Sequence, residues 1–399
     1  MSAPGASAAD RLVITAPAVL TGLPETPVLS PGWVVLRGGQ VDAVGEGAPP
    51  GSADVLLADG YLVPGFVDLQ VNGYYGADLG DVRPEEWARV VRRLPETGTT
   101  AFVPTFVTAP VPRLAGALAT AASFRAELPF GARVLGVHLE GPFISPARRG
   151  AHNPGWMTDP SPAALDELIE AGDGLLALVT LAPERAGGLA AVERLAAAGV
   201  LVSVGHSDAT AAQVAAAADR GARMVTHLYN AQRPLGHREL GVVGQALTDP
   251  RLTSGLIADL HHVSAPAISI ALAAAPGRIA LVTDAAACAG MPPGRYMLGG
   301  EPIELPPGAG QPPVRADGGM AGSALRMDLA VANLAGTGTG LADAVRAATS
   351  IPADLIGRPE LGRIAPGGAG DLVWLGPGLQ ARATWIGGRQ VFGAAPAAG

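Results

Sequence analysis

The feature that most constrains the fold is an alternation of short apolar runs with helical stretches between residues 63 and 359. Eight runs have the length and composition of buried strands: Phe66–Val71, Thr100–Phe106, Val134–Leu139, Leu175–Leu181, Val200–Val204, Met224–Leu228, Thr253–Ala258 and Ile279–Val282. The stretches between them are amphipathic or alanine-rich: Glu85–Leu94, Arg113–Glu127, Ala163–Ile169, Leu189–Ala198, Ala211–Arg220 and Ala265–Ala275. This order predicts an α/β fold with a (β/α)8 TIM-like barrel. An open doubly wound sheet is the alternative, but no Gly-x-Gly-x-x-Gly turn follows the first run.

The two ends of the chain have a different sequence pattern. Short β-type runs separated by Gly, Pro and Asp turns occupy the first sixty residues and return after residue 370. We therefore expect residues 1–62 and 360–399 to form one small β-sandwich domain, and residues 63–359 to form a catalytic barrel domain.

The basic residues are all arginine, 27 in number, and the chain contains no lysine. A P-loop, a Schiff-base enzyme and a pyridoxal-phosphate enzyme each need a lysine amine, so these classes are excluded. A carboxylated lysine bridging two metals is excluded for the same reason.

Several features concern location and partners. A net charge of −8 provides no basic surface for nucleic acid. Residues 1–9 lack a signal-peptide pattern, and the apolar stretch 265–275 is too short to span a membrane. The single cysteine, Cys288, fits a reducing compartment. We expect a cytoplasmic protein without a nucleic-acid or membrane partner.

Polar residues stand where the apolar runs end. Glu140 stands at the end of the third run, His206 at the end of the fifth, His227 at the end of the sixth and Asp284 at the end of the eighth. Any one of them is commonly structural, since a histidine after an apolar run often serves only as a hydrogen-bonded core residue. Strand ends of a barrel meet at one mouth, however, so these groups are expected to converge. One carboxylate and two imidazoles suit a catalytic ion with an open position, and the fourth group can transfer protons.

The chain resembles the N-acetylglucosamine-6-phosphate deacetylases of the amidohydrolase superfamily over essentially its whole length. Seven blocks carry the resemblance: Pro-Gly-Phe-Val-Asp-Leu-Gln-Val-Asn-Gly (64–73), His-Leu-Glu-Gly-Pro-Phe (138–143), Gly-Ala-His-Asn-Pro (150–154), Gly-His-Ser (205–207), Thr-His-Leu-Tyr-Asn-Ala (226–231), Ile-Ala-Asp-Leu-His-His (257–262) and Leu-Val-Thr-Asp-Ala (281–285). A single block is weak support, but seven in the family's order are specific.

The resemblance implies roles for individual residues. It implies that Glu140, His206 and His227 hold one divalent metal, expected to be zinc, with iron or another transition metal as alternatives. It further implies Asp284 as the acid/base and His152 as a contact beside the acetyl carbonyl. The implied phosphate and sugar contacts are the backbone of Asn230 and Ala231, the side chains of Arg238 and His262, and the closing segment Met320, Ala321 and Gly322. The family also implies a homodimer in which phosphate contacts can cross the subunit interface.

Three departures from the family's usual pattern are visible. Gln70 and Asn72 stand where many superfamily members have a His-x-His pair for a second metal, and amides are poor ligands beside imidazole. We therefore expect the second site to be empty or weak. Gln232 and the Leu260-His261 pair also depart from the usual residues near the expected sugar site.

The sequence thus predicts a metal-dependent enzyme that removes the acetyl group of N-acetylglucosamine 6-phosphate. Two alternatives stay open. The substrate can be another N-acyl amino sugar, such as N-acetylgalactosamine 6-phosphate, or the barrel can be a non-catalytic binding protein that holds no metal. His138, one pleat deeper than Glu140, is expected to support the barrel interior, and Cys288 to be a wall residue.

Overall fold

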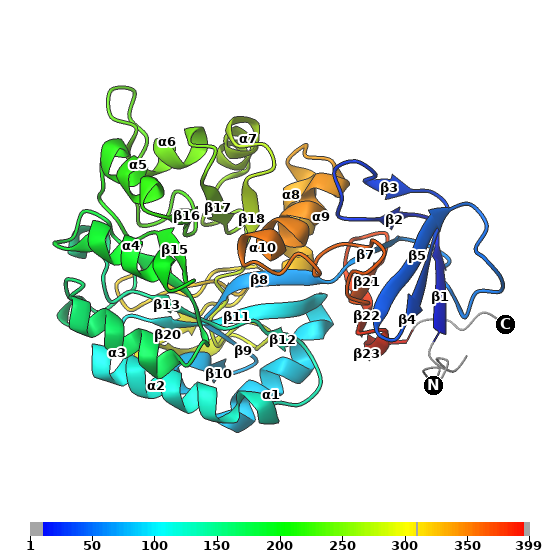
Figure 1. Cartoon of the computed structure of the whole chain (residues 1–399), viewed down its shortest axis with the longest axis horizontal. Coiled ribbons are helices and arrows are strands. Elements are labelled where there is room, and N and C mark those ends of the chain that lie inside the picture. Colours follow the sequence, from blue (N-terminus) through cyan, green and yellow to red (C-terminus); the bar gives the residue numbers. More distant parts are fainter. Residues whose placement is uncertain (1–10, 309, 395–399) are drawn as a thin grey trace, which may run out of the picture.

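A computed structural model describes residues 11–308 and 310–394. The expectation about a signal peptide concerned residues 1–9, which lie outside the described residues. Figure 1 shows a barrel on the left and a smaller β-rich part on the right, with the chain passing from the right part into the barrel and back.

Eight parallel strands form the barrel in chain order, and neighbours along the chain are hydrogen-bonded neighbours in the sheet. They are β8 (Phe66–Val71), β11 (Thr99–Val107), β13 (Val137–Glu140), β14 (Leu176–Leu181), β15 (Leu201–Val204), β16 (Ala222–Val225), β17 (Thr253–Leu256) and β18 (Ile279–Leu281). A parallel bridge between Val71 and Ala285 links the first strand to the end of the last. The predicted barrel is confirmed. The third apolar run was predicted as one strand, but it divides into β12 (Arg133–Val134) and β13 around Gly136.

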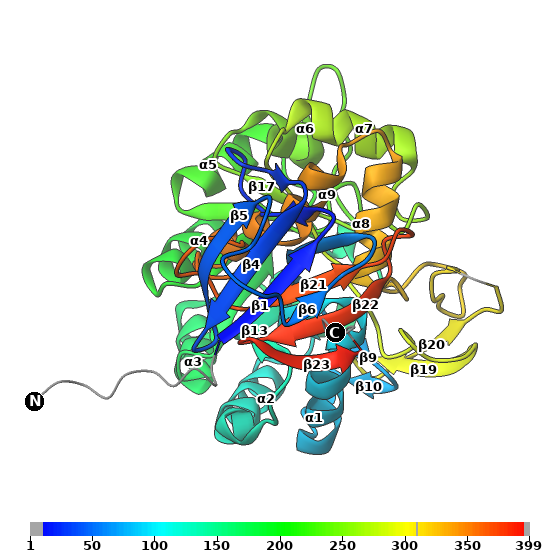
Figure 2. The ribbon, with the colours of Figure 1, turned by 90° about the vertical axis from the view of Figure 1, so that its right-hand side faces the viewer.

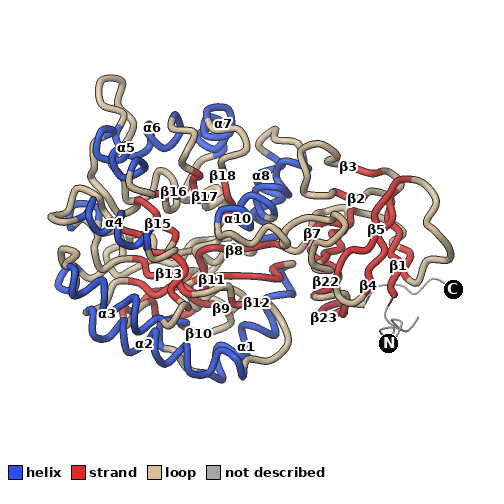
Figure 3. Tube along the Cα trace, in the orientation of Figure 1, coloured by secondary structure: helices blue, strands red, loops and turns tan. Residues whose placement is uncertain are grey.

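Helices surround the strands, as the tube in Figure 3 shows. They are α1 (Pro84–Arg93), α2 (Val111–Phe124), α3 (Pro162–Gly172), α4 (Gly188–Ala197), α5 (Ala211–Asp219), α6 (Gly241–Thr248), α7 (Ala265–Ala274), α8 (Met327–Gly336), α9 (Leu341–Ala348) and α10 (Ser350–Leu355). Capping explains why α5 begins where it does: Thr210 and Gln213 form a capping box. Trp87 of α1 is fully buried against Phe106 of β11 and Phe124 of α2, which ties helix to strand.

Two sheets built from both ends of the chain form the sandwich. One sheet has the order β5 (Gln40–Glu46), β4 (Gly32–Arg37), β1 (Arg11–Ala16) and β6 (Val55–Leu56). The other has the order β23 (Arg389–Gly393), β22 (Ala381–Ile386), β21 (Leu372–Leu375), β7 (Tyr61–Pro64), β2 (Val19–Leu20) and β3 (Val28–Leu29). In Figure 2 the first sheet lies in front of the second. The expected β-sandwich beside the barrel is therefore present.

A separate apolar core lies between these two sheets. Its members come only from residues 14–62 and 364–385, and they include Trp374 and Trp385. This separation supports the division that we propose, with residues 1–62 and 360–399 in the sandwich and 63–359 in the barrel.

Two small antiparallel pairs of strands lie outside the barrel sheet. An antiparallel hairpin, β19 (Gly294–Leu298) and β20 (Glu301–Leu305), follows the last barrel strand and was not predicted from the sequence. A shorter pair, β9 (Gly73–Tyr74) and β10 (Ala77–Asp78), follows β8. Within residues 11–308 and 310–394, the helices fall short of the length and apolar character that crossing a bilayer requires.

Candidate active site

A cavity of about 280 Å³ opens where the barrel strands end. Glu140 is the last residue of β13, and His206 and His227 each follow a strand by two residues. Asp284 follows β18 by three residues. All four side chains line the cavity, and all four residues are buried. The convergence expected from the strand ends is therefore present.

Three of these groups meet atom to atom. Oε1 of Glu140 lies 2.9 Å from Nε2 of His227 and 3.2 Å from Nε2 of His206. The two imidazole nitrogens are 3.1 Å apart. A tetrahedral ion with ligand bonds of about 2.0–2.1 Å separates its ligand atoms by roughly 3.3 Å, so this triangle fits one transition metal. Two facing imidazole nitrogens at this distance also need a proton or a cation between them.

The protonation of these ligand-type atoms follows from their neighbours. Burial acts to raise the pKa of Glu140, but the hydrogen bonds and charges of His206 and His227 hold it well below its usual value. Burial acts to lower the pKa of His227, and Glu140 with Asp284 raises it. Glu140 is thus an anion, which is the form that binds a cation.

The orientation of His206 is fixed by its other nitrogen. Nδ1 lies 2.9 Å from the carbonyl oxygen of Arg148. A carbonyl oxygen can only accept, so Nδ1 carries the proton and Nε2 presents its lone pair to the centre. The backbone at His206 is left-handed, with φ of 46°. Glu184 anchors the following turn, since its carboxylate accepts from Ser207 Oγ at 2.7 Å and from the Asp208 backbone at 2.6 Å.

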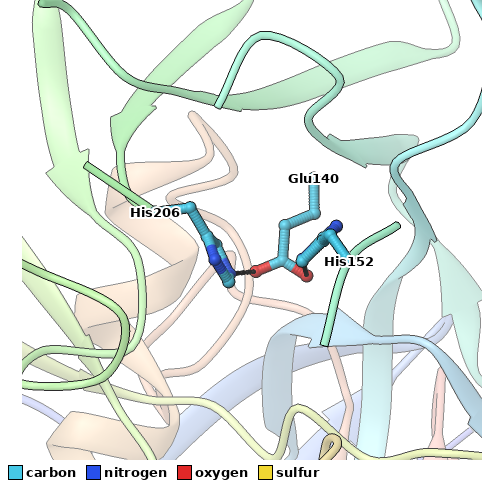
Figure 4. A group of neighbouring side chains, drawn as sticks. All are labelled: Glu140, His152 and His206. Atoms are coloured by element: carbon cyan, nitrogen blue, oxygen red, sulfur yellow. Dashed lines mark hydrogen bonds and ion pairs between the residues drawn. The ribbon is translucent and has the colours of Figure 1, made fainter. Parts of the chain in front are cut away.

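His152 lies on the other side of the Glu140 carboxylate. Figure 4 shows Glu140 between His206 and His152, and these three residues also form a group with ligand-type atoms within 4.8 Å of one another. The backbone N–H of Thr108 donates to Nδ1 of His152 at 3.2 Å. The ring proton is therefore on Nε2, which lies 3.7 Å from Oε2 of Glu140. Burial lowers the pKa of His152 to about 3, so the ring is neutral. His152 thus offers the centre an N–H donor, while His227 offers the better third ligand atom.

Asp284 is held by two amides. Asn72 Nδ2 donates to its Oδ1 at 2.6 Å, and Gln70 Nε2 does so at 3.1 Å while also lying 2.9 Å from Glu140 Oε1. Both hydrogen bonds from the described residues end on Oδ1, which leaves Oδ2 available. Burial, followed by the charge of Glu140, raises the pKa of Asp284 to about 6. A carboxyl group with this pKa can both accept and return a proton near neutral pH.

Some of the remaining predicted site residues line the cavity, and others do not. The cavity wall includes Asn230, Ala231, His262, Met320 and Gly322. Ala321, the middle residue of the closing segment, is buried and does not line the cavity. Arg238 is exposed on the loop before α6 and lies outside the cavity wall of its own chain. A phosphate contact by Arg238 within one subunit is therefore not supported.

The surroundings of His138 and Cys288 agree with the structural roles expected for them. Both ring nitrogens of His138 face threonine hydroxyls, with Thr180 at 2.7 Å and Thr105 at 3.2 Å. Burial lowers the pKa of His138 to about 4. Cys288 is fully buried, and burial raises the pKa of its thiol to about 12, so a thiolate nucleophile is disfavoured.

Several cavity residues were missed in the sequence. They are Asn153, Trp156, Leu298, Gly299, Glu301 and Arg315. Asn153 directly follows His152, and its Nδ2 donates to Glu301 at 3.1 Å across from β20. Because it stands next to His152, Asn153 could have been predicted as a cavity residue from the sequence. Leu298, Gly299 and Glu301 belong to the unpredicted hairpin β19–β20, and Arg315 follows a residue that pairs with β20. Nothing in the composition of the hairpin says that it folds back over the barrel mouth.

Comparison with known proteins gives consistent results. The sequence model of the amidohydrolase family matches residues 61–391. The N-acetylgalactosamine-6-phosphate deacetylase of Escherichia coli O157:H7 is 40% identical over 331 residues, which are 82% of this chain and 87% of that protein. The N-acetylglucosamine-6-phosphate deacetylase of Vibrio furnissii is 37% identical, with 84% of each chain covered. The solved structure of the N-acetyl-D-glucosamine-6-phosphate deacetylase of Mycobacterium smegmatis superposes with a TM-score of 0.89 at 38% identity, covering 96% of this chain and all of that one (100%).

Proposed function

Because the chain belongs to the N-acetylglucosamine-6-phosphate deacetylase family of the amidohydrolase superfamily, we propose that it hydrolyses the N-acetyl group of N-acetylglucosamine 6-phosphate. The products are glucosamine 6-phosphate and acetate. The observation that carries this proposal is the meeting of Glu140, His206 and His227 at 2.9–3.2 Å, with Asp284 tied to the same carboxylate through Gln70.

The proposed ligands of one divalent cation are Glu140, His206 and His227. Zinc suits this set of two imidazoles and a carboxylate, and iron or another transition metal can use the same ligands. When bound, such a cation supplies Lewis-acid chemistry, which polarises the amide carbonyl and acidifies water. Gln70 and Asn72 direct their amide nitrogens to Glu140 and Asp284, so a second metal position at these amides is not part of the proposal.

Proton transfer is assigned to Asp284. Its Oδ1 is held by Asn72 and Gln70, so Oδ2 takes the proton of the attacking water. The same oxygen returns the proton to the amide nitrogen, which leaves as an amine. General acid–base help of this kind typically contributes about 10²–10⁴-fold. His152 donates Nε2–H to the carbonyl oxygen and stabilises the negative charge that develops there.

Substrate binding is assigned to the outer part of the cavity. The backbone of Asn230 and Ala231 and the imidazole of His262 are proposed phosphate contacts. Nδ1 of His262 lies 2.6 Å from Asp259 Oδ2, so Nδ1 carries a proton and Nε2 donates only in the imidazolium form. The segment of Met320, Ala321 and Gly322 is proposed to close over the sugar. Arg238, exposed in its own chain, is proposed to reach the site of a partner subunit in a homodimer.

We propose the cytoplasm as the location of the protein, in line with its single cysteine.

A second candidate substrate is N-acetylgalactosamine 6-phosphate, because a relative with 40% identity is named for that activity. The decisive experiment assays the purified protein on both sugar phosphates and on their unphosphorylated forms, with metal content measured on the same sample. We expect release of acetate from N-acetylglucosamine 6-phosphate with the highest kcat/KM. A higher value for the galactose epimer selects the second candidate. A protein without metal and without turnover is the non-catalytic alternative.

A further inference from the structure

A positively charged side chain that the family resemblance did not single out lines the cavity. Among the described residues that line the cavity, Arg315 is the one with a guanidinium group, and three carboxylates line the same wall: Glu140, Asp284 and Glu301. A further cation from the same subunit would therefore favour binding of a phosphate dianion in this cavity, beside the contact proposed above for His262. Arg238 does not provide it within one chain.

Arg315 stands at the base of a tight turn beside the closing segment. Its backbone N–H donates to the carbonyl of Gly319 at 2.9 Å, and Gly318 donates back to Arg315 at 2.9 Å. The strand-like bridges Val314–Met320 and Glu304–Val314 attach this turn to β20. A Cβ at Gly319 would lie 2.7 Å from Nη2 of Arg315, so the guanidinium packs closely against this turn.

The guanidinium reaches from this turn to the loop that carries His152. Nη1 donates to the carbonyl oxygen of Gly150 at 3.1 Å. Gly150 lies between His206 and Ala231, because a Cβ there would lie 2.9 Å from Cε1 of His206 and 3.7 Å from Cβ of Ala231. Arg315 and Ala231 thus flank the same glycine, and both line the cavity.

The ion pair between Arg315 and Asp317 can be replaced by a contact between Arg315 and a phosphate. Nη2 pairs with Asp317 at 2.9 Å, and the Asp317 side chain is 56% exposed, whereas that of Arg315 is 21% exposed. An ion pair with so exposed a carboxylate is weak. A phosphate offers the fork of arginine two oxygens and a full dianion, which is the stronger partner.

We propose that Arg315 binds the phosphate group of the substrate from within the same subunit, beside the backbone of Ala231. This assignment rests on the proposed function and extends it to the residue that discriminates phosphorylated from unphosphorylated acetamido sugars. It also couples substrate binding to the closing segment, because Arg315 and Met320 stand at opposite ends of one turn.

The test compares Arg315→Gln with Arg315→Lys and with the control Arg295→Gln. Glutamine keeps a donor for the Gly150 carbonyl and removes the charge, and lysine keeps the charge without the fork. Arg295 is exposed on β19 and lies outside the cavity wall. The measurements are kcat and KM for N-acetylglucosamine 6-phosphate and for N-acetylglucosamine. A titration with inorganic phosphate, followed by calorimetry, measures anion binding without turnover.

We expect Arg315→Gln to raise KM for the phosphorylated sugar by about 10- to 100-fold, the usual worth of a charge-assisted contact. The values for the unphosphorylated sugar should stay within about twofold, and Arg315→Lys should fall between wild type and Arg315→Gln. Phosphate binding should weaken in parallel, and Arg295→Gln should match wild type.

Equal losses on both sugars would overturn the proposal, since they would mean that Arg315 only holds the turn. An unchanged KM would overturn it as well. If the wild type turns over none of the sugars, the proposed function fails, yet the phosphate titration still decides the role of Arg315. Undiminished phosphate binding in Arg315→Gln, or none in the wild type, then rejects it.

Discussion

Nδ2 of Asn72 lies 2.6 Å from Oδ1 of Asp284, so a side-chain amide occupies the side of the carboxylate that faces β8. Gln70, which lies in β8 two residues before Asn72, bridges Asp284 and Glu140 with its own amide nitrogen. The two amides thus act as donors to anions. They orient the carboxylate of Asp284, the proposed acid/base, and leave Oδ2 without a hydrogen bond from the described residues.

Replacing Asn72 should shift the pH dependence of the reaction. Asp284 must be ionised to accept a proton, so kcat rises with pH through its pKa, which is about 6 without a metal ion beside it. The Asn72 hydrogen bond stabilises the ionised form and lowers this pKa. Asn72→Ala should therefore move the acidic limb of the kcat profile upward by about one pH unit. The exposed amide variant Gln390→Ala serves as control, and a downward or absent shift contradicts the prediction.

Asp284→Asn should strongly reduce kcat and keep the metal. The amide has the same shape and can still accept from Asn72, but it cannot take a proton from water. We expect kcat to fall by about 10²–10⁴-fold with unchanged metal content by elemental analysis. His206→Ala, measured alongside, should lose both metal and activity. Full activity in Asp284→Asn rules out its assigned role.

Metal content should distinguish His227 from His152. Two candidate ligand sets share Glu140 and His206, and their third member is either His227 or His152. Nε2 of His227 lies 2.9 Å from Oε1 of Glu140, whereas Nε2 of His152 lies 3.7 Å from Oε2. Nδ1 of His152 also accepts from the backbone of Thr108. His227→Ala should therefore bind zinc at least tenfold more weakly, whereas His152→Ala should keep stoichiometric zinc and lose kcat. The opposite pattern would show that His152 is the ligand.

Glu184→Gln should weaken metal binding from a distance. Glu184 accepts two hydrogen bonds from the turn after His206, and that turn sets the left-handed backbone of His206. Loss of the charge should lower metal affinity by about 10- to 100-fold, as is typical for groups that orient a ligand. Competition with a chelator measures it. Glu167→Gln, exposed on α3, is the matched control, and equal affinities in the two variants would contradict the prediction.

Periodicity and chain order were enough to predict the barrel and the sandwich. Buried parallel strands are near-continuous apolar runs, and such runs differ plainly from the alternating strands at the two ends. The residues at the strand ends could be predicted for the same reason: once the strands are placed in a barrel, their ends must share one mouth. Glu140, His206, His227 and Asp284 all follow from this rule.

Arg238 and Arg315 mark the limit of that reasoning. Both are loop arginines in the sequence, and the resemblance singled out the first. In the structure Arg238 is exposed outside its own cavity, whereas Arg315 lies within the cavity wall because a hairpin folds over the barrel mouth. No local pattern fixes how such a hairpin packs, since its position depends on contacts with distant residues such as Asn153.

The sequence by itself determined the fold, the order of its strands and the set of groups at their ends, because these depend on local periodicity and on the fixed geometry of a barrel. Only the tertiary structure decided which nitrogen of His152, His206 and His262 carries a proton, which oxygen of Asp284 is held by amides and which arginine faces the cavity. These properties depend on single hydrogen bonds between residues that are far apart in the chain, and no spacing along the sequence encodes them.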